Sequence, residues 1–247
     1  MILGEEKDNM YYPHYQTSNS NFPILSKRDI SVIAERYARE FMPEIVEDPQ
    51  PFNVDGFAEN YLGLQLDYQY LSNDARYLGM MVFNDTDRVI VYLPDADQAE
   101  YMHADQGTVI IDCSLLAKKQ EHRYRFTMGH ECGHWVFHRS YYGYDASQLN
   151  LFDTQLPYIK CRESIEYDCY GFTNKWEDSK WMEWHADHFS AGLLMPETAV
   201  HLLLNRELSG NSSEQRKITL VSERFNVSEK AAFLRLQELG LIQQPGK

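Results

Sequence analysis

The sequence predicts an α+β fold, because its apolar pattern changes period twice along the chain. Apolar side chains recur at helical spacing over residues 26–41, alternate or form short β-branched runs over 64–112, and return to helical spacing from about residue 119. The 247 residues include 43% hydrophobic and 13% aromatic side chains, enough to fill a sizeable core. We therefore expect a globular domain with a small mixed or antiparallel sheet set among helices.

The first third of the chain predicts a tail followed by two helices. Residues 1–22 are polar and have no apolar period, so we expect a flexible N-terminal tail. Ser26, with Asp29 three residues later, is typical of a helix start, and Pro43 marks the end of that helix. A short helix over 54–61 is expected to end at Gly63.

The middle of the chain predicts four strands. Residues 64–70 alternate between apolar and polar side chains, as a half-buried strand does. Runs at 77–83 and 88–93 are rich in Val, Ile and Tyr and flank Asn84–Asp87, which we interpret as a hairpin turn. The apolar stretch Gly107–Asp112 supplies the fourth strand.

Helical spacing dominates the second half of the chain. The segment 141–179 has no sustained period, and we interpret it as a long irregular insertion. Helices are expected on both sides of it and towards the C-terminus, over 119–139, 180–194, 197–206, 214–225 and 229–239. This pattern predicts a division into the tail 1–22, a central domain 23–206 and a C-terminal helical appendage 207–247.

Charge and cysteine usage narrow the function classes. A net charge of −14 repels nucleic-acid phosphates and disfavours direct DNA or RNA binding. The four cysteines form no CxxC pair, the start has no signal-peptide pattern, and no stretch of about 18 apolar residues exists to span a membrane. We expect a cytoplasmic protein with reduced thiols.

One motif carries chemistry, the run His130-Glu131-Cys132-Gly133-His134. Two histidines four residues apart on a helix lie on one face, so both imidazoles reach one tetrahedral metal. Glu131 lies about 100° round the helix, too far for a comfortable ligand but close enough to take a proton from water beside the metal. Cys132 is assigned to the core and His138 to a structural hydrogen bond.

A third ligand is expected on the helix over 180–194. Glu183 and Asp187 are four residues apart and share one face, which suits Glu183 as ligand and Asp187 as acceptor for a ligating imidazole. His185 and His188 compete for the ligand role, and His185 is the main rival. It lies about 200° from Glu183, so the two cannot both face the metal.

Three stretches resemble the ImmA/IrrE family of zinc metallo-endopeptidases: residues 107–112, 123–138 and 183–196, the last ending in Leu193-Leu194-Met195-Pro196. The resemblance extends over about 25–242. It implies a zincin-like, gluzincin-like core with a short helix-turn-helix-like tail. It also implies that His130, His134 and Glu183 bind Zn²⁺ (or another divalent metal such as Mn²⁺) and that Glu131 is the catalytic base.

The resemblance further implies that the substrate is a helix-turn-helix repressor, whose cleavage releases its promoters.

Two other functions stay open. A structural zinc site closed by a fourth protein ligand (His185, His188 or a cysteine of the insertion) would make the chain a non-catalytic regulator that acts by protein binding. The segment 222–236 has the outline of a DNA-binding helix-turn-helix, but its Lys and Arg are mixed with acids and form no basic face, so packing against the core is favoured.

Overall fold

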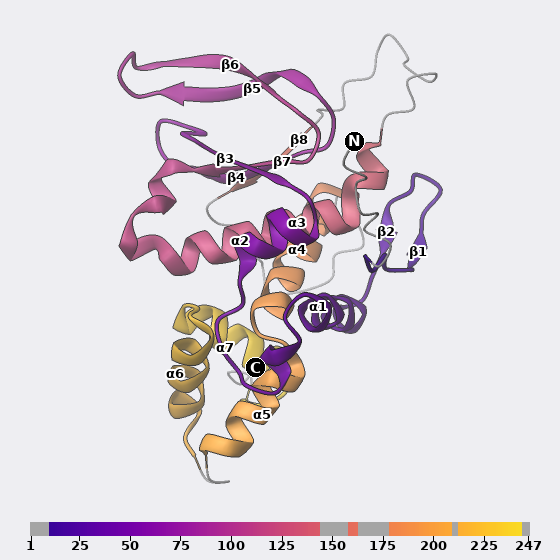
Figure 1. The fold of residues 1–247 in the computed structure, drawn as a ribbon, viewed down its shortest axis with the longest axis vertical. Helices are drawn as coiled ribbons and strands as arrows, with labels where there is room; N and C mark the ends of the chain where they lie inside the picture. Colours follow the sequence, from indigo (N-terminus) through magenta and orange to yellow (C-terminus); the bar gives the residue numbers. More distant parts are fainter. Residues whose placement is uncertain (1–9, 144–157, 163–177, 209–211, 244–247) are drawn as a thin grey trace, which may run out of the picture.

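The computed structural model describes residues 10–143, 158–162, 178–208 and 212–243. A small β-sheet lies above the helix α3, Glu121–Tyr142, and the remaining long helices lie below it (Figure 1). The C-terminal helices form the end of the molecule farthest from the sheet (Figure 1). This confirms the α+β class predicted from the two changes of apolar period.

The described helices follow the predicted ones closely. The first, α1, begins with the expected capping box, in which Ser26 and Asp29 cap one another's backbone N–H groups. Gly63, at φ 72°, follows the short helix pair as expected. The helices are α1 Lys27–Phe41, α2 Val54–Gly56 with a π-helical turn Phe57–Tyr61, α3, α4 Asp178–Leu194, α5 Glu197–Glu207, α6 Glu214–Phe225 and α7 Glu229–Glu238, with 3₁₀ turns at Pro43–Val46, Cys113–Leu116 and Lys118–Gln120.

The main sheet is mixed, and it has the strand order β3-β7-β4-β8. Strand β3 runs parallel to β7, whereas β4 is antiparallel to both β7 and β8. Its strands are β3 Gln65–Gln69, β4 Tyr77–Val82, β7 Thr108–Asp112 and β8 Tyr158–Arg162, and a separate hairpin consists of β5 Thr86–Leu93 and β6 Gln98–Ala104.

The sheet is buried on both faces. Val109 and Ile111 of β7 belong to the large core that includes α3, while Ile110 between them packs in a second core with Val89 and Val91 of the β5–β6 hairpin. Side chains alternate across a strand, so this arrangement explains why β7 is a continuous apolar run. The hairpin covers one face of the sheet and α3 the other.

The prediction of a hairpin turn at Asn84–Asp87 is wrong. The two runs that flank it are strands, but β4 pairs with β7 and β8, and β5 pairs with β6. The turn of the β5–β6 hairpin is at Pro94–Asp97, where Asp97 has a φ of 49°. The error has a physical cause. Which strands pair depends on how their side chains are buried across the sheet, and the residues of a local turn do not predict that pairing.

The irregular insertion predicted over 141–179 contains a strand. Residues 158–162 form β8, in register with β4 from Tyr158↔Val82 onward. Residues 141 and 142 belong to the end of α3, and 178 and 179 begin α4. The rest of the insertion, 144–157 and 163–177, lies outside the described residues.

Residues 10–22, part of the predicted tail, make defined contacts with the helices. The Tyr37 hydroxyl donates to the Tyr11 carbonyl at 2.9 Å, and the Tyr15 hydroxyl donates to the Phe137 carbonyl at 3.2 Å. Phe22 is buried just before β2 Pro23–Ile24, which pairs with β1 Gln16–Thr17. The tyrosines that gave this segment its polar pattern take part in the hydrogen bonds that attach it to the helices. Residues 1–9 lie outside the described part.

The C-terminal helices pack against the core. Asn226, in the left-handed conformation between α6 and α7, accepts a hydrogen bond at its carbonyl from Arg125 of α3 at 3.1 Å. Its side chain lies 2.9 Å from His122. Packing of this tail on the core is therefore confirmed, while the boundaries of the three-part division stay a prediction. Within the described residues, no helix has both the length and the apolar character needed to cross a bilayer.

Candidate metal centre

Two glycines let α3 and α4 approach closely. A Cβ on Gly133 would meet the Ala186 backbone at 3.0 Å, and a Cβ on Gly129 would meet the Ser190 hydroxyl at 2.6 Å. The Ser190 hydroxyl in turn donates to the Phe126 carbonyl at 2.8 Å. Glycine lowers helix propensity, and at these positions the cost is offset by close packing of the two helices. The close packing brings the side chains of α4 next to the histidines of α3.

His130, His134 and Glu183 converge at this crossing. Each offers a ligand atom, and the three atoms lie within 4.8 Å of one another. Glu183 Oε2 lies 3.3 Å from His130 Nε2, and Glu183 Oε1 lies 3.5 Å from His134 Nε2. Burial alone would raise the pKa of Glu183, but the contacts with both histidines hold that pKa well below its ordinary value. Glu183 is thus an anion facing two imidazole nitrogens.

Glu131 is fully buried beside this group. Strand β4 lies directly over it, since a Cβ on Gly79 would collide with Glu131 Oε1 and approach Thr127 Cγ2 to 2.8 Å. Burial raises the pKa of the Glu131 carboxyl to about 8, against the opposing effect of His130. The carboxyl therefore titrates near neutral pH, where a group that exchanges protons works best.

The donor set fits a metal ion. Both Glu131 carboxylate oxygens and His134 Nε2 are buried, and none has a hydrogen-bond partner among the described residues. Folded chains pair nearly all such atoms, because an unpaired buried polar group costs free energy. Two imidazole nitrogens and one carboxylate are a ligand set that zinc accepts, and three protein ligands are typical of its catalytic sites. The residues present are thus suited to a divalent ion.

The two histidines have different outer partners. His130 Nδ1 lies 2.7 Å from Asp187 Oδ1, which confirms the contact predicted from the spacing of Glu183 and Asp187. His134 Nδ1 lies 3.0 Å from His138 Nδ1. A carboxylate thus backs one imidazole, and a second imidazole backs the other.

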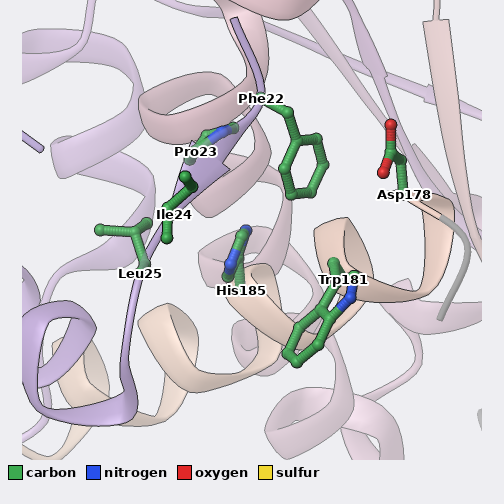
Figure 2. Close-up of a pocket in the computed structure, with 7 residues that line it drawn as sticks. All are labelled: Phe22, Pro23, Ile24, Leu25, Asp178, Trp181 and His185. Atoms are coloured by element: carbon green, nitrogen blue, oxygen red, sulfur yellow. The ribbon is translucent and has the colours of Figure 1, made fainter. Parts of the chain in front are cut away.

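His185, the rival third ligand, faces away from the group. Its Nδ1 lies 3.3 Å from His138 Nε2, and its ring helps to line a cavity of about 270 Å³ between the chain around β2 and α4 (Figure 2). In Figure 2, His185 lies between the Phe22–Leu25 segment and Trp181. Glu183, and not His185, lies with the two histidines, as the helical angle between them requires.

Other residues of the site were not predicted from the sequence. Gly79, Gly129 and Gly133 each permit a close approach, and two glycines inside a helical pattern were the available signal for the last two. Two tyrosines of α3 and β8 have hydrogen-bond partners of their own: the Tyr142 hydroxyl donates to Met182 Sδ at 3.6 Å, and the Tyr158 hydroxyl to the Arg88 carbonyl at 3.4 Å.

Fold and site together define an α+β protein with a His-His-Glu group suited to a metal ion. The chain belongs to the family of the IrrE N-terminal-like domain, a peptidase family whose model matches residues 89–237. This match confirms the resemblance noted from the motifs, and it indicates a metallopeptidase-like role. The match spans both α3 and α4, so it includes His130, Glu131, His134 and Glu183.

Among solved structures, the chain is similar to a Mycobacterium tuberculosis transcriptional regulator, with 14% sequence identity and a TM-score of 0.41. That match covers 92% of this chain and 50% of the regulator, so the chain spans half the length of that protein. None of the curated proteins matches the sequence.

Proposed function

We propose that this chain is a zinc-dependent metallo-endopeptidase that hydrolyses peptide bonds of a regulatory protein. One observation carries the proposal: the ligand atoms of His130, His134 and Glu183 lie within 4.8 Å of one another, and the buried Glu131 lies on the helix that carries the two histidines. Membership in a peptidase family supports it.

His130, His134 and Glu183 are the proposed ligands of Zn²⁺, with Mn²⁺ as another divalent ion of suitable charge. When bound, the ion supplies Lewis-acid polarisation of the scissile carbonyl and makes a water acidic near neutral pH. Glu131 is the proposed catalytic base, which takes the proton of the attacking water and delivers it to the leaving amine. Its pKa, raised by burial, suits both directions of transfer.

The alternative is a non-catalytic regulator with a structural zinc ion. A structural site needs four protein ligands. The candidate group contains three within the described residues, and His185, one of the proposed fourth ligands, faces His138 instead. The ligand count and the buried carboxyl of Glu131 both favour the peptidase.

We propose a helix-turn-helix repressor as the substrate and the cytoplasm, where such repressors act, as the location. The support is the family to which the chain belongs. Direct DNA binding by α6 and α7 is disfavoured, because Arg235 of the second helix is fully buried and the chain carries a net charge of −14.

The test compares the proteins of cells that express wild type, Glu131→Gln or Glu121→Gln. Glu121 lies on the same helix and is exposed, so its variant is the matched control. We expect one DNA-binding repressor to be replaced by two fragments with wild type and Glu121→Gln, and to stay intact with Glu131→Gln. The purified repressor should then be cut by the zinc-loaded protein and spared after chelation. Equal cleavage by Glu131→Gln would contradict the mechanism.

A further inference from the structure

Three buried imidazoles form a continuous string that leads away from the candidate metal centre. His134 Nδ1 lies 3.0 Å from His138 Nδ1, and His138 Nε2 lies 3.3 Å from His185 Nδ1. None of the three residues is more than 1% exposed. A neutral imidazole has one N–H donor and one acceptor nitrogen, so three such rings can hydrogen-bond in sequence.

The direction of this string follows from the metal site. In the metal-loaded protein, His134 Nε2 binds the ion beside Glu183, so Nε2 is then the bare nitrogen and Nδ1 carries the proton. Nδ1–H then donates to His138 Nδ1, which leaves the proton of His138 on Nε2. That proton is donated to His185 Nδ1. Each contact thus fixes the tautomer of the next ring.

The outer end of the string is held by aromatic packing. The His185 ring lies 5.7 Å from Phe22, 6.1 Å from Phe137 and 6.4 Å from Trp181, measured between ring centroids. Rings packed on several sides restrict rotation of the imidazole. His185 therefore offers its Nδ1 to His138 from a fixed position at the cavity shown in Figure 2.

We propose that His138 is a positioning residue, held in turn by His185, which fixes the tautomer and ring orientation of His134 at the metal centre. The inference rests on the proposed function, because it assigns a role towards the same ion. The proposal also assigns a role to His185, which is not one of the three proposed ligands: it holds His138 in place.

The contrast with His130 sharpens the proposal. His130 donates to a carboxylate, Asp187, which raises the basicity of a ligating imidazole, whereas His138 supplies His134 with a neutral acceptor. The His138 contact orients the ring without adding charge. Loss of an outer partner of this kind typically lowers metal affinity by about 10- to 100-fold.

Three substitutions at one position separate the two contacts of His138. His138→Asn places an amide oxygen near the Nδ1 position and keeps an acceptor for His134. His138→Gln places its amide near the Nε2 position and keeps only the contact with His185. His138→Phe keeps the ring volume and neither contact. Zinc affinity is measured by competition with a chromophoric chelator, and circular dichroism of the metal-free proteins checks folding.

We expect His138→Asn to bind zinc within about threefold of wild type, and the Gln and Phe variants to bind it about 10- to 100-fold more weakly. The inference is overturned if the Gln and Phe variants bind zinc as tightly as wild type, or if the Asn variant loses as much as they do. Failure of wild type itself to bind zinc would instead contradict the proposed function.

A spectroscopic measurement on wild type does not depend on the folding of any variant. In zinc-loaded protein labelled with ¹⁵N-histidine, long-range proton–nitrogen correlation spectra distinguish the two neutral tautomers. The string requires His134 to be protonated on Nδ1 and His138 on Nε2. Protonation of His138 on Nδ1 would overturn the inference even if zinc binds.

Discussion

Arg235 in the C-terminal helices and Glu131 at the candidate metal centre are both fully buried ionisable residues with very different surroundings. Arg235 Nε donates to the Met195 carbonyl at 3.1 Å and Nη2 donates to the Ser31 hydroxyl at 2.9 Å, whereas Nη1 has no hydrogen-bond partner among the described residues but forms an ion pair with Glu238 Oε1 at 3.4 Å. Neither carboxylate oxygen of Glu131 has a hydrogen-bond partner within the described residues.

This difference separates folding from function. Arg235 lies on α7 and reaches α1 and the end of α4, so its contacts join three helices that are far apart in sequence. The Glu131 carboxylate makes no hydrogen bond among the described residues that would stabilise the fold, and its burial costs free energy. A buried polar group that the chain pairs stabilises the fold, whereas one that it leaves unpaired is retained for a bound ion or a reactant.

The largest effect is expected from Glu131→Gln, which should lower the cleavage rate by about 10²- to 10⁴-fold, the usual contribution of a general base. Stability should respond in the opposite sense. A carboxyl whose folded pKa is raised to about 8 lowers stability progressively as pH rises above its unfolded value of about 4.3. Metal-free Glu131→Gln should therefore be at least as stable as wild type at pH 8 in urea unfolding. A less stable variant would mean that Glu131 is a structural residue.

Arg235→Met should lower the free energy of unfolding by about 3 kcal/mol, because Glu238 and the Ser31 and Met195 acceptors lose their partner. The measurement is urea unfolding of the metal-free protein. Arg224→Met is the matched control, since its ion pair with Glu207 is exposed and typically contributes less than about 1 kcal/mol. Equal losses in the two variants would remove the distinction drawn for Arg235.

Gly79→Ala tests the position of Glu131 without removing it. The new Cβ must displace the carboxyl, and a displacement of about 1 Å lowers activity by roughly 10²-fold while zinc affinity stays near that of wild type. Gly143→Ala is the control, because its Cβ would meet nothing closer than 3.4 Å. Unchanged cleavage by Gly79→Ala would show that the strand above Glu131 does not set its position.

The smallest effect concerns acid pH and Glu238. Burial opposes ionisation of this carboxyl, but His188 and Arg235 hold its pKa below the ordinary value. Its contribution to stability is therefore present above the unfolded pKa of about 4.3 and is lost as pH falls through the folded pKa. The urea midpoints of wild type and Glu238→Gln should differ at pH 7 and converge towards pH 3. The exposed Glu223→Gln is the control, and a gap that widens on acidification would contradict the sign.

Local signals allowed much of the fold to be predicted from the sequence. The capping box at Ser26, the turn at Asn226 and the helices α3 and α4 are specified by residues within a few positions of one another. Strand pairing is not local in this way. The pairing of β4 with β8 joins residues about 80 positions apart, and the turn residues near β4 do not predict this partner.

The candidate site shows the same limit. The spacing of His130 and His134 and of Glu183 and Asp187 predicted which faces carry the polar groups, and the structure brings these groups together. Gly79 could not be found in this way, because its importance depends on β4 crossing α3 above Glu131. The string from His134 to His185 likewise depends on how two helices cross.

The most direct test of the central claim is zinc K-edge X-ray absorption on the purified protein, together with its metal content. The proposed centre predicts one zinc ion per chain, bound by two imidazoles and one carboxylate with no sulfur neighbour, and loss of that zinc in His134→Ala. Four protein ligands, a thiolate ligand or zinc retained by His134→Ala would contradict the assignment of His130, His134 and Glu183 as a catalytic metal centre.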